Sequence, residues 1–214
     1  YEDLRINDTD RFQYVFPYYN FTKNINPLNV GTLSFASKGD NILDNTNNMK
    51  SKVINDLTFK TNNMIFEELG IKNNFNVYFK NLNSIGKNVS NYKSSPQIEL
   101  QSLFELNSEL PLIKYNETTT QTLIPRISLK FNPGDMKNHS DAERKININN
   151  IFDVNRIGVD DTFEEGGSLT LGMNFKKENN LDYSKFIEYN LATVFRNKEE
   201  NNIPSQTTLN KKQS

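Results

Sequence analysis

Short alternations of apolar and polar residues recur about ten times along the chain, separated by gaps rich in Asn, Gly, Pro and Ser. The stretch Arg11–Phe21 places four aromatic residues on one face, namely Phe12, Tyr14, Phe16 and Tyr18. The stretch Ser168–Lys177 does the same with Leu169, Leu171, Met173 and Phe175. Successive side chains of a strand point to opposite sides of a sheet. The pattern therefore predicts a continuous antiparallel sheet whose apolar side is covered by another sheet or by lipid.

The composition separates these two kinds of cover. Only 35% of the residues are hydrophobic, against roughly 45–50% in soluble domains, and the mean hydropathy is −0.70. A β-sandwich needs more Val, Ile and Leu to fill its core, whereas the lumen of a transmembrane barrel is polar. Aromatic residues make up 11% of the chain, which argues against disorder. We therefore expect an all-β fold, an antiparallel up-and-down transmembrane β-barrel segment of about ten strands that leaves the barrel incomplete.

The strands are expected near residues 10–22, 30–38, 50–61, 73–82, 95–108, 121–132, 145–153, 167–177, 185–197 and 205–210. Several are about ten residues long, which is enough to cross a bilayer when tilted. Pro17, Pro96 and Pro125 fall within these strands or at their starts, where each removes a backbone donor. They predict strand ends or bulges.

Two of the expected strands carry charged residues on one face only. In the first, Glu99, Gln101 and Glu105 lie opposite an apolar face; in the second, Arg126, Ser128 and Lys130 do so. If the two strands pair, Glu105 is expected opposite Arg126, and we predict that this polar face lines a lumen. A lysine in place of Leu129 should then block membrane assembly, whereas one in place of Ser128 should be tolerated.

Composition also argues against several functions. The net charge of −1 does not favour nucleic acid, and the chain has no Cys. His139 is the only histidine and lies in a polar stretch, so it is expected to be a surface loop residue and not part of a metal site. No nucleophile elbow or phosphate-binding loop is present. We therefore expect neither catalysis nor a cofactor.

Several stretches resemble the barrel domain of the LptD (OstA/Imp) family of outer-membrane lipopolysaccharide-assembly proteins. Asn150–Asp161, NIFDVNRIGVDD, is followed by Ser168–Phe175, SLTLGMNF, and Tyr189–Arg196 reads YNLATVFR. Ser94–Lys114, Leu123–Asn138 and Arg11–Phe21 are similar to other strands of that domain. The motif positions are Asn155, Arg156, Gly158, Asp160, Gly172 and Arg196.

The resemblance implies that residues 1–214 are one internal piece of such a barrel, without an internal domain boundary, in the outer membrane of a Gram-negative bacterium. It implies insertion of lipopolysaccharide into the outer leaflet, contact with outer-membrane lipid, and two protein partners: a plug lipoprotein of the LptE type and a periplasmic transport bridge. No bond would be made or broken. A general porin or receptor barrel and a soluble, secreted, carbohydrate-binding β-sandwich remain as alternatives.

Two polar groups near the motif have competing interpretations. Asp160, Asp161, Glu164 and Glu165 are oxygen-rich enough for Ca²⁺, but their spacing is not that of an EF-hand, which favours a solvated acidic turn. Arg156 either meets a passing lipopolysaccharide phosphate or fixes an inward-folded loop through a salt bridge. The sequence favours the salt bridge.

Overall fold

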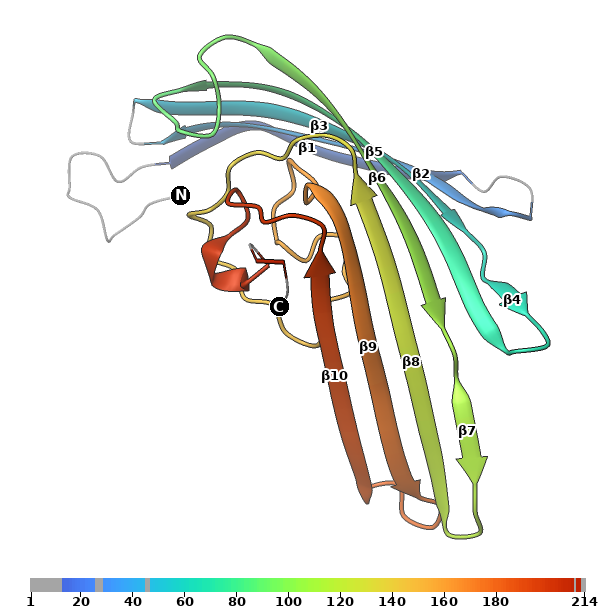
Figure 1. Ribbon diagram of the computed structural model, residues 1–214. Coiled ribbons are helices and arrows are strands. Elements are labelled where there is room, and N and C mark those ends of the chain that lie inside the picture. Colours follow the sequence, from blue (N-terminus) through green and yellow to red (C-terminus); the bar gives the residue numbers. More distant parts are fainter. Residues whose placement is uncertain (1–12, 26–28, 45–46, 210, 213–214) are drawn as a thin grey trace. The chain divides into compact units, whose positions relative to one another are not determined.

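The computed structural model describes residues 13–25, 29–44, 47–209 and 211–212. Within them, ten antiparallel strands form one up-and-down sheet in the order β1-β2-β3-β5-β6-β8-β9-β10, with β4 beside β5 and β7 beside β8 (Figure 1). The strands are β1 (Gln13–Ile25), β2 (Gly31–Asp44), β3 (Asn48–Thr61), β4 (Met64–Phe66), β5 (Ile71–Lys87), β6 (Gln97–Glu109), β7 (Leu112–Tyr115), β8 (Thr119–Asn132), β9 (Gly166–Asn179) and β10 (Phe186–Arg196). In the described residues β1 and β10 end the strand order, so the sheet is not closed into a barrel.

The chain divides into two compact units. The first consists of Tyr1–Phe59 and Val77–Ser102, and the second of Lys60–Asn76 and Leu103–Ser214. In the first, Ile54, Leu82 and Tyr92 form a small buried cluster. In the second, a larger buried cluster joins the long β8–β9 connection, the C-terminal segment and β10; it contains Met136, Ile151, Ile157, Val194, Ile203 and Leu209. No helix in the described residues is long and apolar enough to cross a membrane.

Eight of the predicted strands are present, with shifted ends, and Pro96 directly precedes β6 as expected. The predicted strands at 145–153 and 205–210 are wrong. Asn147 forms a turn instead: its carbonyl accepts hydrogen bonds from the backbone N–H groups of Asn150 and Ile151. Its side-chain oxygen also accepts from the N–H of Asn149, an interaction by which Asn competes with sheet pairing. Residues 205–207 form the 3₁₀ helix η1 (Ser205–Thr207).

Pro17 produces the bulge that the sequence predicted, because the pairing of β1 with β2 shifts by one residue around it. The shift moves every later side chain of β1 to the other face. Tyr18 therefore does not share the face of Tyr14, contrary to the expected row of four aromatic residues, and Tyr19 takes its place. Phe12 lies outside the described residues.

A two-residue turn sets the register of the hairpin formed by β6, β7 and β8. The backbone N–H of Asn116 donates to the carbonyl of Thr119 at 2.9 Å, and the same register continues along β6 as far as Phe104. Pro125 lies inside β8 without shifting this register. The carbonyl of Pro125 accepts a hydrogen bond from the N–H of Leu110, but proline has no backbone N–H to donate in return. The ladder of backbone hydrogen bonds is therefore interrupted there, between β6 and β7.

The connections of the second unit differ in length between the two ends of its strands (Figure 1). The turns at 116–118 and 180–185 are short, whereas the connection 133–165 is long. We call this connection the β8–β9 loop. It packs back onto the sheet, since Phe152 and Ile157 contact the cluster that contains Val194 and Ala192 of β10.

Candidate functional site: a polar covered face and an apolar exposed face

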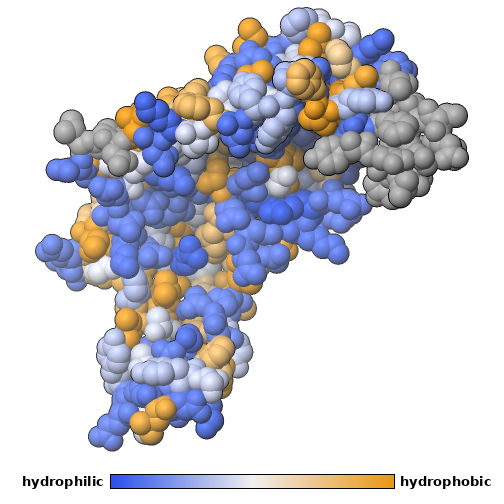
Figure 2. Space-filling model, turned by 180° about the vertical axis from the view of Figure 1, so that it is seen from behind, coloured by the Kyte–Doolittle hydropathy of each residue, from blue (hydrophilic) through white to orange (hydrophobic). Residues whose placement is uncertain are grey.

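The sheet of the second unit reverses the usual distribution of polarity. On β8, Ile127, Leu129 and Phe131 are 44, 46 and 51% exposed, while Ser128, Lys130 and Asn132 are 0, 6 and 1% exposed. A sheet in a soluble protein buries its apolar face and exposes its polar one. Hydrophilic residues predominate over the surface shown in Figure 2. An exposed apolar face opposite a covered polar one is the distribution found in membrane barrels.

The residues of the apolar face, some exposed and some half-buried, line up in rows across the strands. The rows are Leu106–Leu129–Leu169–Phe195, Ile127–Leu171–Thr193, Pro125–Met173–Leu191 and Leu123–Phe175–Tyr189, in which Thr193 is the one polar member. On β8 this apolar band runs from residue 123 to residue 131, about 26 Å at about 3.3 Å per residue. Its length matches the roughly 9–11 residues with which a tilted strand crosses a bilayer. Phe175 stacks on Tyr189 with ring centroids 6.4 Å apart.

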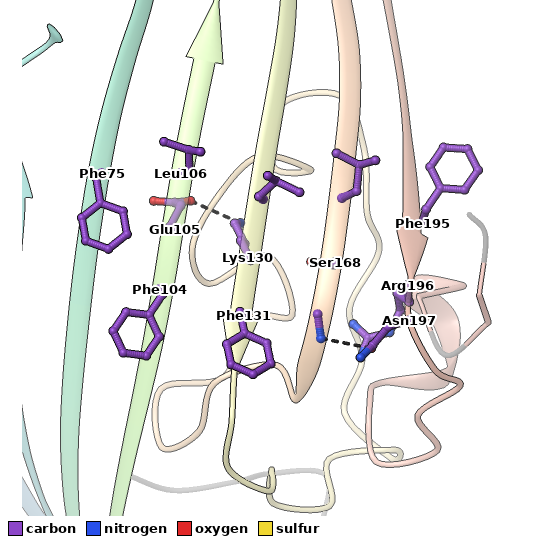
Figure 3. A pocket seen from close by; sticks show the side chains of 13 residues that line it. Phe75, Phe104, Glu105, Leu106, Lys130, Phe131, Ser168, Phe195, Arg196 and Asn197 are labelled. Atoms are coloured by element: carbon purple, nitrogen blue, oxygen red, sulfur yellow. Dashed lines mark hydrogen bonds and ion pairs between the residues drawn. The ribbon is translucent and has the colours of Figure 1, made fainter.

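The covered face carries a buried ion pair. Lys130 Nζ lies 3.7 Å from Glu105 Oε1 (Figure 3). Asn76 Nδ2 donates to Glu105 Oε2 at 2.8 Å. The register places Glu105 opposite Lys130, and Arg126 opposite Glu109, so the predicted pairing of Glu105 with Arg126 is wrong. The reason is the short turn at 117–118, which brings the two strands together four residues away from the expected register.

The other residues of the predicted polar face lie as follows. Ser128 is fully buried, and Arg126 is exposed with its guanidinium 4.6 Å from the ring centroid of Phe152. In the first unit, Gln101 is buried and Glu99 half-buried, while Ile98 and Leu100, which alternate with them along the strand, are highly exposed. Polar and apolar residues therefore occupy opposite faces, as the sequence predicted.

Arg156 joins the β8–β9 loop to the covered face of β9. Its guanidinium donates to both carboxylate oxygens of Glu164, at 2.7 and 2.6 Å, and to the hydroxyls of Ser168 and Thr170, each at 2.8 Å. The side chain is fully buried, and burial lowers the pKa of Arg156 to about 10, so it remains charged at neutral pH. The predicted salt bridge of Arg156 is thus present.

Neighbouring motif residues shape the turn that presents Arg156. The Asn155 carbonyl accepts from the N–H of Gly158, whose φ of +76° favours glycine. Arg144 packs over Gly158, and its Nε donates to the Arg156 carbonyl at 2.9 Å. Asp160 lies half-buried in the same loop.

Two further motif positions lie on the strands beneath the loop. A Cβ on Gly172 of β9 would lie 2.5 Å from the Phe152 ring, so only glycine lets this loop residue approach the sheet. Arg196, the last residue of β10, bonds to Glu164 Oε1 and donates to the carbonyl of Glu165 at 2.6 Å. Asn155, Arg156 and Gly158 therefore lie in one turn, Arg196 shares Glu164 with Arg156, and Gly172 contacts Phe152 of the same loop.

Two of the acidic residues of the loop are buried, which contradicts the expected solvated turn. Glu164 and Asp161 are buried; Glu164 binds Arg156 and Arg196, and Asp161 Oδ1 lies 2.9 Å from His139 Nε2. His139 is correspondingly not a surface residue, with its side chain 12% exposed. In the described part of the chain no group of three or more His, Cys, Asp or Glu residues is arranged to hold a metal ion.

Glu165 fastens the other side of the loop. It binds the Lys198 ammonium and accepts a hydrogen bond from the N–H of Met136 at 3.1 Å. Burial raises the pKa of Glu165, but the hydrogen bonds from Lys198 and Met136 outweigh it and leave that pKa below its ordinary value.

Sequence reasoning missed two features of the covered face. Lys130 donates to the carbonyls of Phe152 and Asp153, which attaches the β8–β9 loop to the sheet at a second point besides Arg156. Further along the strands lies a polar hollow of about 460 Å³, lined by Glu109, Arg126, Asn149, Asn174, Glu188 and Asn190. The period-two pattern placed several of these residues on one face, but their grouping depends on a register that only the turns determine.

No protein-family model matches this chain, and no curated protein is significantly similar to it.

Proposed function

We propose that this chain is part of a β-barrel in the outer membrane of a Gram-negative bacterium, with the covered polar face toward the lumen and the apolar band in the hydrocarbon. The observation that carries the proposal is the reversed polarity of the second unit, where Leu129 is exposed and its neighbour Ser128 is fully buried. In water an exposed apolar surface of this length is unfavourable, whereas in a bilayer it is required.

Within that setting, the barrel serves to insert lipopolysaccharide into the outer leaflet. Two features support this role: the motif around Asn155, Arg156, Gly158 and Asp160, which resembles that of the LptD family, and the polar hollow on the covered face. The hollow combines a guanidinium, two amides of β9 and β10, and two carboxylates, which can donate to and accept from the hydroxyl groups of a saccharide.

The contribution of this chain is passive. Its polar face accommodates the saccharide, and its apolar face anchors the barrel in lipid; the energy for transport comes from partners. These are a plug lipoprotein of the LptE type and a periplasmic bridge that delivers lipopolysaccharide.

A matched pair of lysine substitutions tests the membrane location. Leu191 and Asn190 are adjacent residues of β10, both exposed, on opposite faces. Leu191→Lys places a charge in the hydrocarbon at a cost of about 2–4 kcal/mol near the bilayer midplane, so the amount of assembled protein in outer-membrane fractions should fall sharply. Asn190→Lys places the same charge beside Glu188 and should assemble normally. Ser128 is not a suitable control, because it is fully buried. Equal yields for the two variants would contradict the proposal.

Depletion of the protein in its own cell tests the transport role. The quantity measured is lipopolysaccharide accessible at the cell surface, which should fall as the protein is depleted. Unchanged surface lipopolysaccharide together with lost uptake of a small solute would favour a porin or receptor barrel instead. The soluble β-sandwich has less support, because all strands in the described residues belong to one sheet.

A further inference from the structure

The apolar face of the second unit contains a hollow of about 450 Å³ (Figure 3). Its walls come from β5, β6, β8, β9 and β10 and include Phe75, Phe104, Leu129, Phe131, Leu169 and Phe195. The side chains of Phe104 and Phe131 stand together on one side, and Phe195 stands on the other (Figure 3).

A glycine creates this hollow. Phe104 lies opposite Phe131, and Phe131 lies opposite Gly167, so the third strand of this row has no side chain. The backbone does not need a glycine there: Gly167 has no positive φ, and an added Cβ would meet only the Asn197 side chain, at ordinary distances of 3.6 Å or more. Gly167 therefore leaves space on the apolar face that a side chain could occupy.

The two ends of the hollow differ in polarity. In one direction the apolar rows continue along the strands toward Tyr189. At the other end, the Asn197 side-chain oxygen accepts from the N–H of Gly167 at 3.0 Å, and the partly exposed Lys198 follows. The carbonyl of Lys212 accepts from the N–H of Arg196 at 2.7 Å, which brings the exposed residues Lys211 and Lys212 to the same end.

We propose that this hollow holds one acyl chain of an anionic membrane lipid, with the lipid phosphate beside Asn197 and the lysines at the polar end. The apolar walls match a hydrocarbon chain, and Lys211 and Lys212 complement the charge of a phosphate, whereas Lys198 at the same end is paired with Glu165. The inference rests on the proposed function only in requiring that the apolar band lies in a membrane. It goes beyond that function by fixing one lipid at one position on the barrel.

The test uses the purified protein in vesicles of phosphatidylcholine that contain phosphatidylglycerol with a photoactivatable acyl chain. Crosslinks located by peptide mass spectrometry should concentrate on Leu129, Phe131 and Leu169. Gly167→Phe fills the hollow and should lower this crosslinking about tenfold, equivalent to losing roughly two buried methylene groups. Leu171→Phe adds the same ring to the same face of β9 outside the hollow and should leave the yield unchanged.

The outcomes separate this inference from the proposed function. Uniform crosslinking along the band, unaffected by Gly167→Phe, would overturn the lipid site while leaving the membrane location intact. Crosslinking absent from the whole apolar face would contradict the membrane location itself. Equal yield with phosphatidylcholine carrying the same photoactivatable chain would overturn the part of the proposal that assigns the phosphate to the lysines.

Discussion

At the scale of single residues, Arg156 connects three parts of the second unit. Its guanidinium binds Glu164 of its own loop and the Ser168 and Thr170 hydroxyls of β9, while Glu164 also binds Arg196 of β10. Removing one partner of a buried ion pair destabilises the protein, because the remaining charge is then buried without a partner.

Arg156→Ala should therefore destabilise the β8–β9 loop by about 3–5 kcal/mol and lower the yield of assembled protein. Arg156→Lys should rescue only part of the yield, because an ammonium cannot form the two parallel bonds to Glu164. Arg144→Ala is the control, since the Arg144 guanidinium donates to the backbone carbonyl of Arg156 and not to Glu164. Heat-modified mobility in gels would report the folded fraction; full assembly of Arg156→Ala would contradict the role given to it.

Alanine substitutions at Gly172 and Gly167, both on β9, should differ in their effect on stability. Gly172→Ala forces a Cβ into the Phe152 ring, 2.5 Å away, and should destabilise the protein by about 1–3 kcal/mol as an overpacked site does. Gly167→Ala meets only ordinary contacts and should be close to neutral. Urea unfolding of both variants in the same lipid would measure the difference, and equal midpoints would show that Phe152 can move away at no cost.

At the scale of elements, the sequence predicted where strands lie better than how they pair. Alternation identified β8 and β9 because a strand with one apolar face keeps a strict period of two. The same alternation at 145–153 was misleading, since the side chains of Asn147 and Asn150 form local turns. The partner of Glu105 depended on the short turn at 117–118, which periodicity alone cannot locate.

The β8–β9 loop should detach from the sheet more easily in acid. The pKa of Glu165 is lowered in the folded protein, so its contribution to stability is complete above the pKa of the unfolded chain and is lost as the pH falls through the lower, folded value. Cleavage of the loop by an acid-active protease should therefore increase in that range. Glu165→Gln should show faster cleavage at neutral pH and a weaker dependence on acid; identical pH profiles for the two proteins would contradict this assignment.

At the scale of the whole molecule, the account depends on which face of the sheet meets lipid. The sequence indicated the polarity of each face, and the structure shows that the polar face of the second unit is the covered one, beneath a loop held by Arg156, Lys130 and Glu165. The sequence predicted an inward-folded loop fixed by a salt bridge of Arg156, and that salt bridge is present. It did not predict that Lys130 and Lys198 also hold the loop, because these contacts join residues far apart in the chain. Arg156 and Arg196 both bind Glu164, so these two motif positions indicated where the loop is held.

The most direct test of the central claim is the environment of alternate residues along β10. Single cysteines at Ile187, Glu188, Tyr189, Asn190 and Leu191, each the only cysteine in this chain, would carry spin labels in the protein embedded in its membrane. The account predicts a strict alternation: labels at 187, 189 and 191 accessible to lipid-soluble oxygen, and labels at 188 and 190 accessible to a water-soluble relaxation agent. Labels equally accessible to the aqueous agent at all five positions would contradict the membrane location of the apolar face.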